Sequence, residues 1–287
     1  MSNDSNGTHG KRDTEHRFQF GKNWRSFLDV LNEDRIKSAE KSLRNNLEAD
    51  DLSGKKFLDI GSGSGLFSLA ARRLGAEVFS LDYDATSVAC TGELQRQYFP
   101  KDPYWTIEQG SVLDADYIRR LGQFDVVYSW GVLHHTGAMW TALENAQIPV
   151  GPSGKLYIAI YNQQRPWTAV WTQVKKIYNL LPRPLRMPFA LVVIAPIEFR
   201  SLLYSLLRLD PLSYVRSWTH YGRDSRGMSR WHDIIDWVGG YPFETAKPEQ
   251  IFDFYRARGF VLRRLSTCGC GLGCNEYVFQ RERESSP

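Results

Sequence analysis

The chain has 287 residues, of which 42% are hydrophobic and 24% are charged, and its net charge is +4. These values are typical of a globular chain that buries a sizeable core, and they exclude a chain that is disordered throughout. The small charge and the lack of a Lys/Arg block argue against a nucleic-acid partner. Four cysteines, a polar N-terminus and the lack of an apolar run of about 18 residues predict a cytoplasmic protein without a membrane-spanning helix.

The first part of the chain divides into a tail and a leader. Residues 1–17 are polar and follow no period, which predicts a disordered tail. From residue 18 to Leu47, apolar residues recur at helical spacing and predict one or two amphipathic helices. We expect these helices to pack on the sheet that follows them.

Residues 56–65 read Lys-Phe-Leu-Asp-Ile-Gly-Ser-Gly-Ser-Gly and predict a strand that ends in a tight turn. The alanine-rich run that follows, residues 66–74, predicts a helix. Glycines permit a positive φ and let a ligand approach the backbone, and the start of the helix offers unpaired N–H groups. The pattern therefore predicts a ligand site at the turn, with a ligand-free strand-to-helix turn as the alternative.

The spacing of the glycines narrows the choice of ligand. A dinucleotide fingerprint has its third glycine at the position of Leu66, which disfavours an oxidoreductase. Glycines at alternate positions after Leu-Asp-Ile instead resemble the cofactor loop of the class I methyltransferases. The resemblance implies a Rossmann-like sheet and S-adenosyl-L-methionine as the cofactor. The residues that it assigns to the cofactor here are Asp59, Gly61, Ser62, Gly63 and Gly65.

The second predicted strand ends in Asp82. A carboxylate at this place in a βαβ unit can accept hydrogen bonds from both ribose hydroxyls, and Asp82 resembles the family's ribose-binding acid. Tyr83 follows it and is assigned to the cofactor as well, whereas helix capping explains Asp84. In the proteins that this chain resembles, the leader packs over the cofactor, which makes Phe20 and Trp24 candidates to cover it.

The third predicted strand begins at Trp105 and is followed by Ser111, Val112 and Asp114. The family often has an acid directly after this strand to hold the adenine amino group, and this chain departs from that pattern. The Ser111 hydroxyl and the Val112 backbone are candidates to hold adenine, and Asp114 is the alternative. A turn without a ligand also fits these residues.

Residues 124–136 resemble the fourth strand of small-molecule methyltransferases, many of which have Val-Leu-His-His here. The segment lacks the Asn/Asp-Pro-Pro-Tyr/Phe tetrapeptide of enzymes that methylate the amino groups of bases. Trp130 is expected at the carboxyl end of the strand, where open α/β sheets bind ligands, and is assigned to the cofactor. His135 or His134 is a candidate general base because imidazole titrates near neutrality. Packing beneath the loop is the alternative for either ring.

After a fifth predicted strand, residues 163–248 are expected to form a mostly helical insertion that binds the substrate. Within it, residues 187–207 are apolar but interrupted by Glu198 and Arg200, so they are not expected to cross a bilayer. Three roles fit this stretch: a helix pair buried on the domain, a dimer contact, or an interfacial helix that admits a lipidic substrate. Residues 185–209 are therefore candidates for a peripheral membrane contact or a homodimer contact.

Residues 218–244 combine glycines with a dense set of His, Arg, Asp and aromatic side chains. Such a set is costly in a loop unless its groups pair with one another or with a ligand. A helix that carries a structural salt-bridge network is one interpretation, and substrate binding is the other. A polar or anionic substrate could be bound by Arg226, Arg230, Asp233 and Asp236, with Trp231, Trp237 and Tyr241 as stacking walls. His220 and Tyr221 are further candidates for substrate binding. His232 is a candidate base that Asp236, four residues later, could orient, and a metal pair of these two residues is the alternative.

The C-terminal segment, residues 249–287, contains a helix that ends before Gly259 and two strands that resemble the family's closing antiparallel hairpin. The connection between the strands has three cysteines, but a structural zinc site usually needs a fourth ligand, so no metal is expected. Asn275, after the last of these cysteines, is a candidate to face the substrate. The cysteines are Cys268, Cys270 and Cys274.

These segments agree with one architecture over residues 50–162 and 245–282. We predict an α/β fold with a seven-stranded Rossmann-like sheet, a closing antiparallel hairpin, a helical leader, and a helical insertion after the fifth strand. The predicted parts are a disordered tail (1–17), the leader with the cofactor-binding core (18–162), the insertion (163–248) and the segment that completes the core (249–287).

The resemblance implies a methyltransferase of the small-molecule branch that includes quinone-modifying enzymes. Its acceptor is expected to be a hydroxyl of a quinol or phenol, lipid-linked or of the natural-product type, and a nitrogen or carbon acceptor is the alternative. A non-catalytic regulatory module that binds the cofactor is the alternative of another class. The expected location is the cytoplasm, with peripheral membrane contact as an option.

Overall fold

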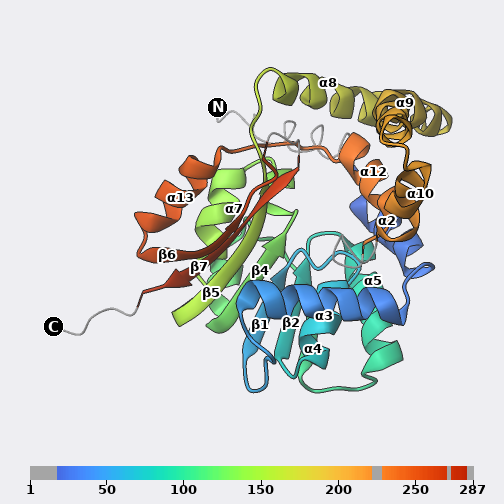
Figure 1. The fold of residues 1–287 in the computed structure, drawn as a ribbon. Helices are drawn as coiled ribbons and strands as arrows, with labels where there is room; N and C mark the ends of the chain where they lie inside the picture. The colour runs from blue at the N-terminus through green and yellow to red at the C-terminus, as the bar shows by residue number, and fades with distance from the viewer. Residues whose placement is uncertain (1–17, 222–227, 270–272, 283–287) are drawn as a thin grey trace, which may run out of the picture.

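The computed structural model describes residues 18–221, 228–269 and 273–282. The predicted tail, the substrate-binding candidate Arg226 and Cys270 lie outside the described residues. A seven-stranded sheet lies at its centre, in the order β3-β2-β1-β4-β5-β7-β6 (Figure 1). This confirms the predicted sheet. The strands are β1 (Lys56–Ile60), β2 (Glu77–Asp82), β3 (Trp105–Gln109), β4 (Phe124–Trp130), β5 (Val150–Tyr161), β6 (Phe260–Ser266) and β7 (Cys274–Arg281).

Strands β1 to β5 run parallel, and β7 pairs antiparallel with both β5 and β6. The predicted closing hairpin is therefore present. Chain order reverses between β1 and β4, because β2 and β3 lie on one side of β1 and the later strands lie on the other. The carboxyl ends of the parallel strands meet at one edge of the sheet, and a reversal of strand order opens a crevice there.

Helices cover both faces of the sheet, and the strand side chains alternate between the two cores as strand geometry requires. Phe57 and Val78 lie in the core under α3, α4 and α5. Leu58 and Leu81 lie in the core under α6, α7 and α13. Each buried side chain of this size stabilises the fold by roughly 1.5–3 kcal/mol, so both layers anchor the strand ends. The covering helices are α3 (Glu33–Leu47), α4 (Leu66–Arg73), α5 (Ala85–Tyr98), α6 (Ala115–Arg120), α7 (Met139–Ala146) and α13 (Pro248–Arg256).

The helices between β5 and α13 build a third hydrophobic core of their own. Trp171, Ile194 and Ile235, from three different helices, pack together in it. In Figure 1 these helices stand apart from the two layers on the sheet, at the upper right, next to the leader helix α2 (Phe20–Leu28). They are α8 (Trp167–Leu180), α9 (Arg183–Leu207), α10 (Pro211–Thr219) and α12 (Arg230–Gly239).

One of the three roles considered for residues 185–209, a helix pair buried on the domain, is wrong. The stretch lies mostly in one helix of 25 residues, α9, and only 17% of its most apolar window is buried. Among the described residues, α9 is the helix that could cross a membrane by length and composition alone. Hydropathy does not tell which neighbouring elements cover a helix, so the sequence could not show this exposure.

Candidate active site

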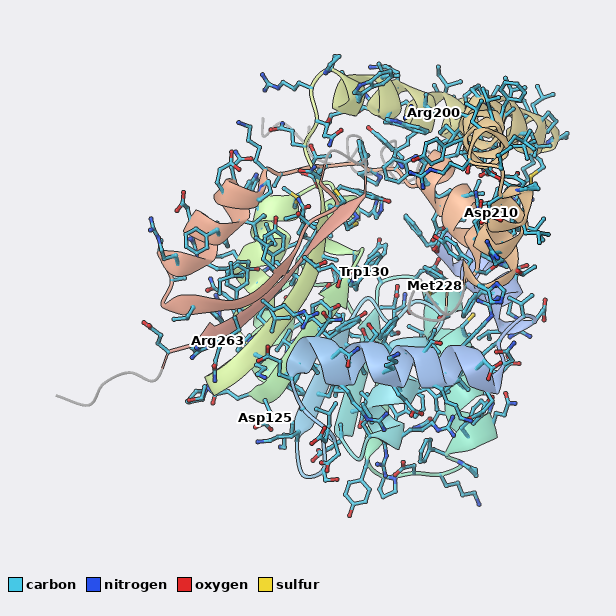
Figure 2. The ribbon with its side chains drawn as sticks, in the orientation of Figure 1. Asp125, Trp130, Arg200, Asp210, Met228 and Arg263 are labelled. Carbon is cyan, nitrogen blue, oxygen red and sulfur yellow. The ribbon has the colours of Figure 1, made fainter. Side chains whose placement is uncertain are left out.

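A cavity of about 1370 Å³ opens at the carboxyl ends of the parallel strands. Helices α2, α9 and α12 contribute to its other walls. Trp130 and Met228, both labelled in Figure 2, line it from the sheet and from the chain just before α12. This is the place where open α/β sheets bind ligands. The lining residues that end the five parallel strands are Ile60, Asp82, Gln109, Trp130 and Tyr161.

The turn after β1 presents its backbone to this cavity. Asp59, Ser62 and Gly63, which were assigned to the cofactor from the sequence, all line it. Gly61 also lines it, with φ +80°, and a Cβ built there would lie 2.4 Å from Cγ1 of Val132. A side chain at this position would therefore displace the neighbouring loop.

Gly65 was predicted to contact the cofactor, but it does not line the cavity. It precedes α4 with φ +82°, and a Cβ built there would lie 2.8 Å from Cα of Thr91. This glycine lets the turn pack closely against α5, so its role in the structure is in packing.

Asp82 ends β2, and its carboxylate orders two neighbouring turns. Oδ2 accepts a hydrogen bond from the Gly63 N–H at 2.9 Å, and Oδ1 accepts one from the Asp84 N–H at 2.9 Å. Burial raises the pKa of Asp82 to about 6, although these backbone hydrogen bonds act in the opposite direction. Each carboxylate oxygen can accept a second hydrogen bond, so Asp82 can serve a ligand in the cavity as well.

Asp59 lies in β1, beside Asp82 and behind the turn. Its Oδ2 accepts a hydrogen bond of 2.6 Å from Ser68, at the end of a buried chain that runs from the Trp105 indole N–H through Ser80. Burial raises the pKa of Asp59 to about 7, with the Ser68 hydrogen bond opposing this rise and the Asp82 carboxylate adding to it. Between about pH 4 and pH 7, the folded chain therefore keeps a proton on Asp59 that the unfolded chain has released.

Replacing this residue, Asp59→Asn, is expected to stabilise the chain near pH 8 and to have a small effect near pH 4. The unfolded carboxyl ionises at a pKa of about 4, whereas the folded carboxyl stays protonated up to about pH 7. The wild-type chain therefore loses stability as the pH rises through this window, by roughly 2–4 kcal/mol in total. Urea unfolding at both pH values measures the difference. The exposed Asp116→Asn is the control, and equal stabilisation at both pH values would contradict the argument.

The leader helix α2 joins the turn after β2 to the insertion. The Gly21 N–H donates to Oδ2 of Asp84 at 3.0 Å, and Nδ2 of Asn23 donates to Oδ1 of Asp236 at 2.8 Å. Both predicted covering residues, Phe20 and Trp24, line the cavity. The structure thus places them where they can cover a ligand, and their contact with a cofactor stays a prediction.

One part of the cavity lies beside the carboxyl ends of β2 and β3. Tyr83, Ser111 and Val112 line it, together with Gln109, whose Nε2 donates to the Tyr83 carbonyl oxygen at 3.0 Å. Asp114, the alternative candidate for adenine, lies outside the cavity and caps α6 by accepting a backbone N–H at 2.9 Å. The structure therefore favours Ser111 and Val112 over Asp114.

His135 is the histidine that lines the cavity among the described residues. Its Nδ1 lies 2.6 Å from the carbonyl oxygen of Pro242, and Nδ1 carries the proton because a carbonyl oxygen only accepts. In the neutral ring Nε2 is then an acceptor, as a general base requires. The rings of Phe20 and Tyr161 flank the imidazole, with centroid separations of 4.9 and 5.4 Å.

The two other histidines considered as bases do not reach the cavity. His134 is fully buried, its ring centroid lies 4.0 Å from that of Tyr161, and burial lowers its pKa well below the ordinary value. Packing beneath the loop therefore accounts for His134. His232 is also buried, and its ring packs 5.8 Å from that of Phe27. Neither ring can take a proton from a substrate without a rearrangement of the fold.

Of the described residues predicted to bind substrate, His220, Trp231 and Asn275 do not line the cavity. Those that line it are Tyr221, Arg230, Asp233, Asp236, Trp237 and Tyr241. His220 is exposed at the end of α10, and Trp231 is 38% exposed on α12. Asn275 is buried, and its amide donates to Asn162 at 3.2 Å to link two chain segments. These residues were selected by composition, which does not tell which face of a helix or strand they take.

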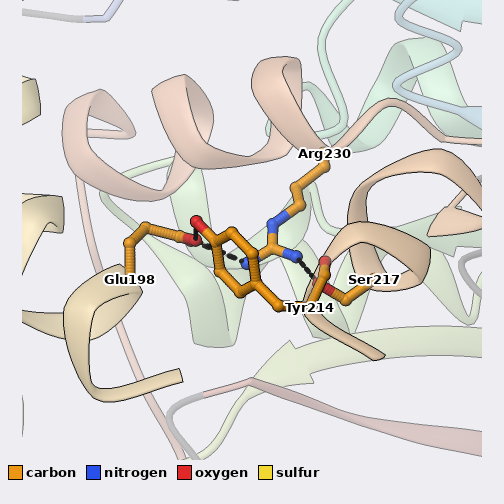
Figure 3. A network of polar contacts seen from close by, with 4 residues as sticks. All are labelled: Glu198, Tyr214, Ser217 and Arg230. Atoms are coloured by element: carbon orange, nitrogen blue, oxygen red, sulfur yellow. Dashed lines mark hydrogen bonds and ion pairs between the residues drawn. The ribbon is translucent and has the colours of Figure 1, made fainter. Parts of the chain in front are cut away.

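Glu198, Asp233 and Asp236 form an acidic wall of the cavity. Asp233 and Asp236 were predicted to contact the substrate, whereas Glu198 was not. Arg230 pairs with Glu198 at 2.7 Å, and the Tyr214 hydroxyl donates to the same carboxylate at 2.9 Å (Figure 3). Burial and the neighbouring Asp233 raise the pKa of Asp236 well above its ordinary value. Glu198 is the single acid of the apolar helix α9, and this isolated charge was the signal that could have pointed to it.

A family model described as "Methyltransferase domain" matches residues 31–189, which is more than half of the chain. A ubiquinone biosynthesis O-methyltransferase of Proteus mirabilis is 29% identical over 138 residues, which cover 47% of this chain and 54% of that protein. The chain spans about half the length of the curated relatives that it matches.

Two solved structures share the fold at low sequence identity. A magnesium protoporphyrin IX methyltransferase from Synechocystis, with bound S-adenosylhomocysteine, has a TM-score of 0.51 and 13% identity, and the match covers 87% of this chain and 84% of that one. A 1,6-didemethyltoxoflavin-N1-methyltransferase from Burkholderia thailandensis has a TM-score of 0.50 and 13% identity, with coverage of 95% and 90%.

Proposed function

Because the chain belongs to the methyltransferase-domain family, we propose that it is an enzyme that transfers a methyl group from S-adenosyl-L-methionine to a small-molecule acceptor. The observation that carries the proposal is that one cavity contains both the Asp82 carboxylate with its glycine turn and the His135 imidazole. A regulatory module that only binds the cofactor would have no use for a base in that cavity.

The residues around the glycine turn fit the proposed cofactor. Gly61 and Gly63 line the cavity, and Asp82 can accept two hydroxyl hydrogen bonds at the end of β2. Trp24 and Trp130 add aromatic surface nearby. When bound, the cofactor supplies a methyl group on a positively charged sulfur, which is already activated for transfer.

The rest of the cavity fits an acceptor that is mostly apolar. Tyr161, Trp237 and Ile194 line it, and such a wall can exclude water and hold a flat ring. His135 would accept the proton of an acceptor hydroxyl through Nε2, while its Nδ1 hydrogen bond to Pro242 keeps the ring oriented. We therefore propose O-methylation of a quinol or phenol, which the relative named for ubiquinone biosynthesis supports.

An amine acceptor is the second candidate, and the acidic wall favours it. Asp233 lines the cavity beside aromatic side chains, and this combination attracts an ammonium group. The amine would have to lose its proton before it could attack, and His135 could accept that proton too. The cytoplasmic location stays a prediction.

Calorimetry and labelled-methyl transfer together test the proposed function. We expect micromolar binding of S-adenosyl-L-methionine and S-adenosylhomocysteine and no binding of NADH. A metabolite extract incubated with the enzyme and carbon-13-methyl-labelled cofactor is expected to yield a labelled product, and the carbon shift of its methyl group separates O-methyl from N-methyl. NADH binding without binding of the adenosyl ligands would overturn the proposal, and cofactor binding without any labelled product would favour the regulatory module.

A further inference from the structure

Helix α9 presents an apolar stripe to the outside of the molecule. Val192, Phe199 and Leu207 are 71%, 67% and 74% exposed, which is the reverse of the usual arrangement on a surface helix. The residues of this stripe recur at helical spacing, and we call them the outer face of α9. They are Leu185, Val192, Phe199, Leu203, Leu206 and Leu207.

The segment that contains α9 concentrates positive charge. Residues 163–219 have eight Lys and Arg against two acids, a formal net charge of +6, whereas the whole chain has +4, so the remainder has −2. Lys175 is buried and does not contribute to the surface charge of this segment. Both acids form ion pairs: Glu198 pairs with Arg230, and Asp210 pairs with Arg216 at 2.5 Å. Arg200 and Arg208 are exposed next to Phe199 and Leu207. Apolar and aromatic side chains beside exposed arginines are the composition of a helix that binds an anionic membrane surface.

The opposite face of α9 is fixed to the protein. Ala190 and Ile194 are buried in the third hydrophobic core, and the Glu198 carboxylate is tied to α12 by Arg230 and to α10 by Tyr214 (Figure 3). These contacts leave one stripe available to lipid, so the helix would lie in the plane of the interface instead of crossing the bilayer.

We propose that the outer face of α9 docks on an anionic lipid bilayer, with the flanking arginines at the headgroups. A second copy of the chain is disfavoured as the occupant, because a symmetric contact through this face would bring two positively charged segments together. Ile194, Ile197 and Glu198 line the cavity from the other side of the same helix. Docking would therefore bring the acceptor cavity within one helix diameter of the lipid.

Co-sedimentation of the full chain with vesicles tests the proposal. We expect binding to vesicles of phosphatidylglycerol and phosphatidylcholine, weak binding to phosphatidylcholine alone, and a decrease of severalfold at about 0.5 M salt. The double substitution Val192→Asp and Phe199→Asp should weaken binding by about tenfold or more, because it removes apolar contact and adds negative charge.

A matched pair of exposed apolar positions elsewhere, Val30→Asp and Leu265→Asp, should leave vesicle binding unchanged. Light scattering without lipid and calorimetry with S-adenosyl-L-methionine are measured on every variant. Absence of co-sedimentation, equal binding to both vesicle types, or equal loss in both pairs would overturn the proposal. So would a dimer that only Val192→Asp and Phe199→Asp dissociate. None of these readouts depends on methyl transfer, so the proposed function and the docking surface can fail separately.

Discussion

Replacing Asp82 by alanine is expected to weaken S-adenosyl-L-methionine binding by about 100- to 1000-fold. A hydrogen bond to a charged group contributes roughly 1.5–3 kcal/mol, and this carboxylate is placed to accept two of them from the ribose. The substitution also removes the acceptor of the Gly63 N–H, which orders the glycine turn over which the cofactor would lie. Calorimetry with S-adenosyl-L-methionine and S-adenosylhomocysteine measures the change directly.

The control is an aspartate that also accepts a backbone hydrogen bond but lies at the opposite edge of the sheet from the cavity. Asp125 also accepts a backbone N–H, that of Lys56, at 2.9 Å, but it lies at the start of β4, away from the cavity. Asp125→Ala should leave the affinity unchanged, and thermal unfolding of both variants shows whether they fold. A folded Asp82→Ala variant with wild-type affinity would contradict the proposed cofactor site.

His135→Gln is expected to lower kcat by about 100- to 10,000-fold while leaving the cofactor affinity close to that of the wild type. Glutamine can still donate to the Pro242 carbonyl oxygen, but it cannot accept a proton from an acceptor hydroxyl at neutral pH. The effect should therefore appear in kcat more than in KM, since the contact shape is largely retained. Steady-state kinetics with the acceptor identified from the labelled extract measures both values.

The exposed His220 provides the matched control, because His220→Gln makes the same chemical change outside the cavity. It should leave kcat unchanged. A loss of less than about tenfold for His135→Gln would show that no proton transfer to this ring limits the rate. That result would remove His135 from its proposed role and would favour an acceptor that attacks as a neutral amine.

The strand ends and the glycine turn could be predicted because they depend on neighbouring residues. The apolar run of β1 ends at glycines, which predicts the positive φ at Gly61. The run of β2 ends at Asp82, which predicts a carboxylate at the end of that strand. Gly65 carried the same local pattern and belongs to the packing against α5 instead. A glycine in such a turn indicates that another group approaches the backbone closely. Only the neighbouring elements show whether that group is a ligand or a helix.

For the two adjacent histidines, local pattern could not predict which ring faces the cavity. His134 and His135 occupy consecutive positions of one short turn, and nothing in their order tells which ring faces the cavity. The choice depends on Pro242 and Gly240, more than 100 residues later, which contact His135. The acidic wall of the insertion depends in the same way on how α9, α12 and α2 pack against one another.

Local sequence patterns were enough to predict the α/β fold, the glycine turn and the carboxylate at the end of the second strand, because these features arise from backbone conformation and hydrophobic periodicity within short segments. The tertiary structure alone decided which histidine reaches the cavity and that α9 turns an apolar face outward. Burial is a property of the contacts between distant segments, and a linear pattern of residue types does not contain those contacts.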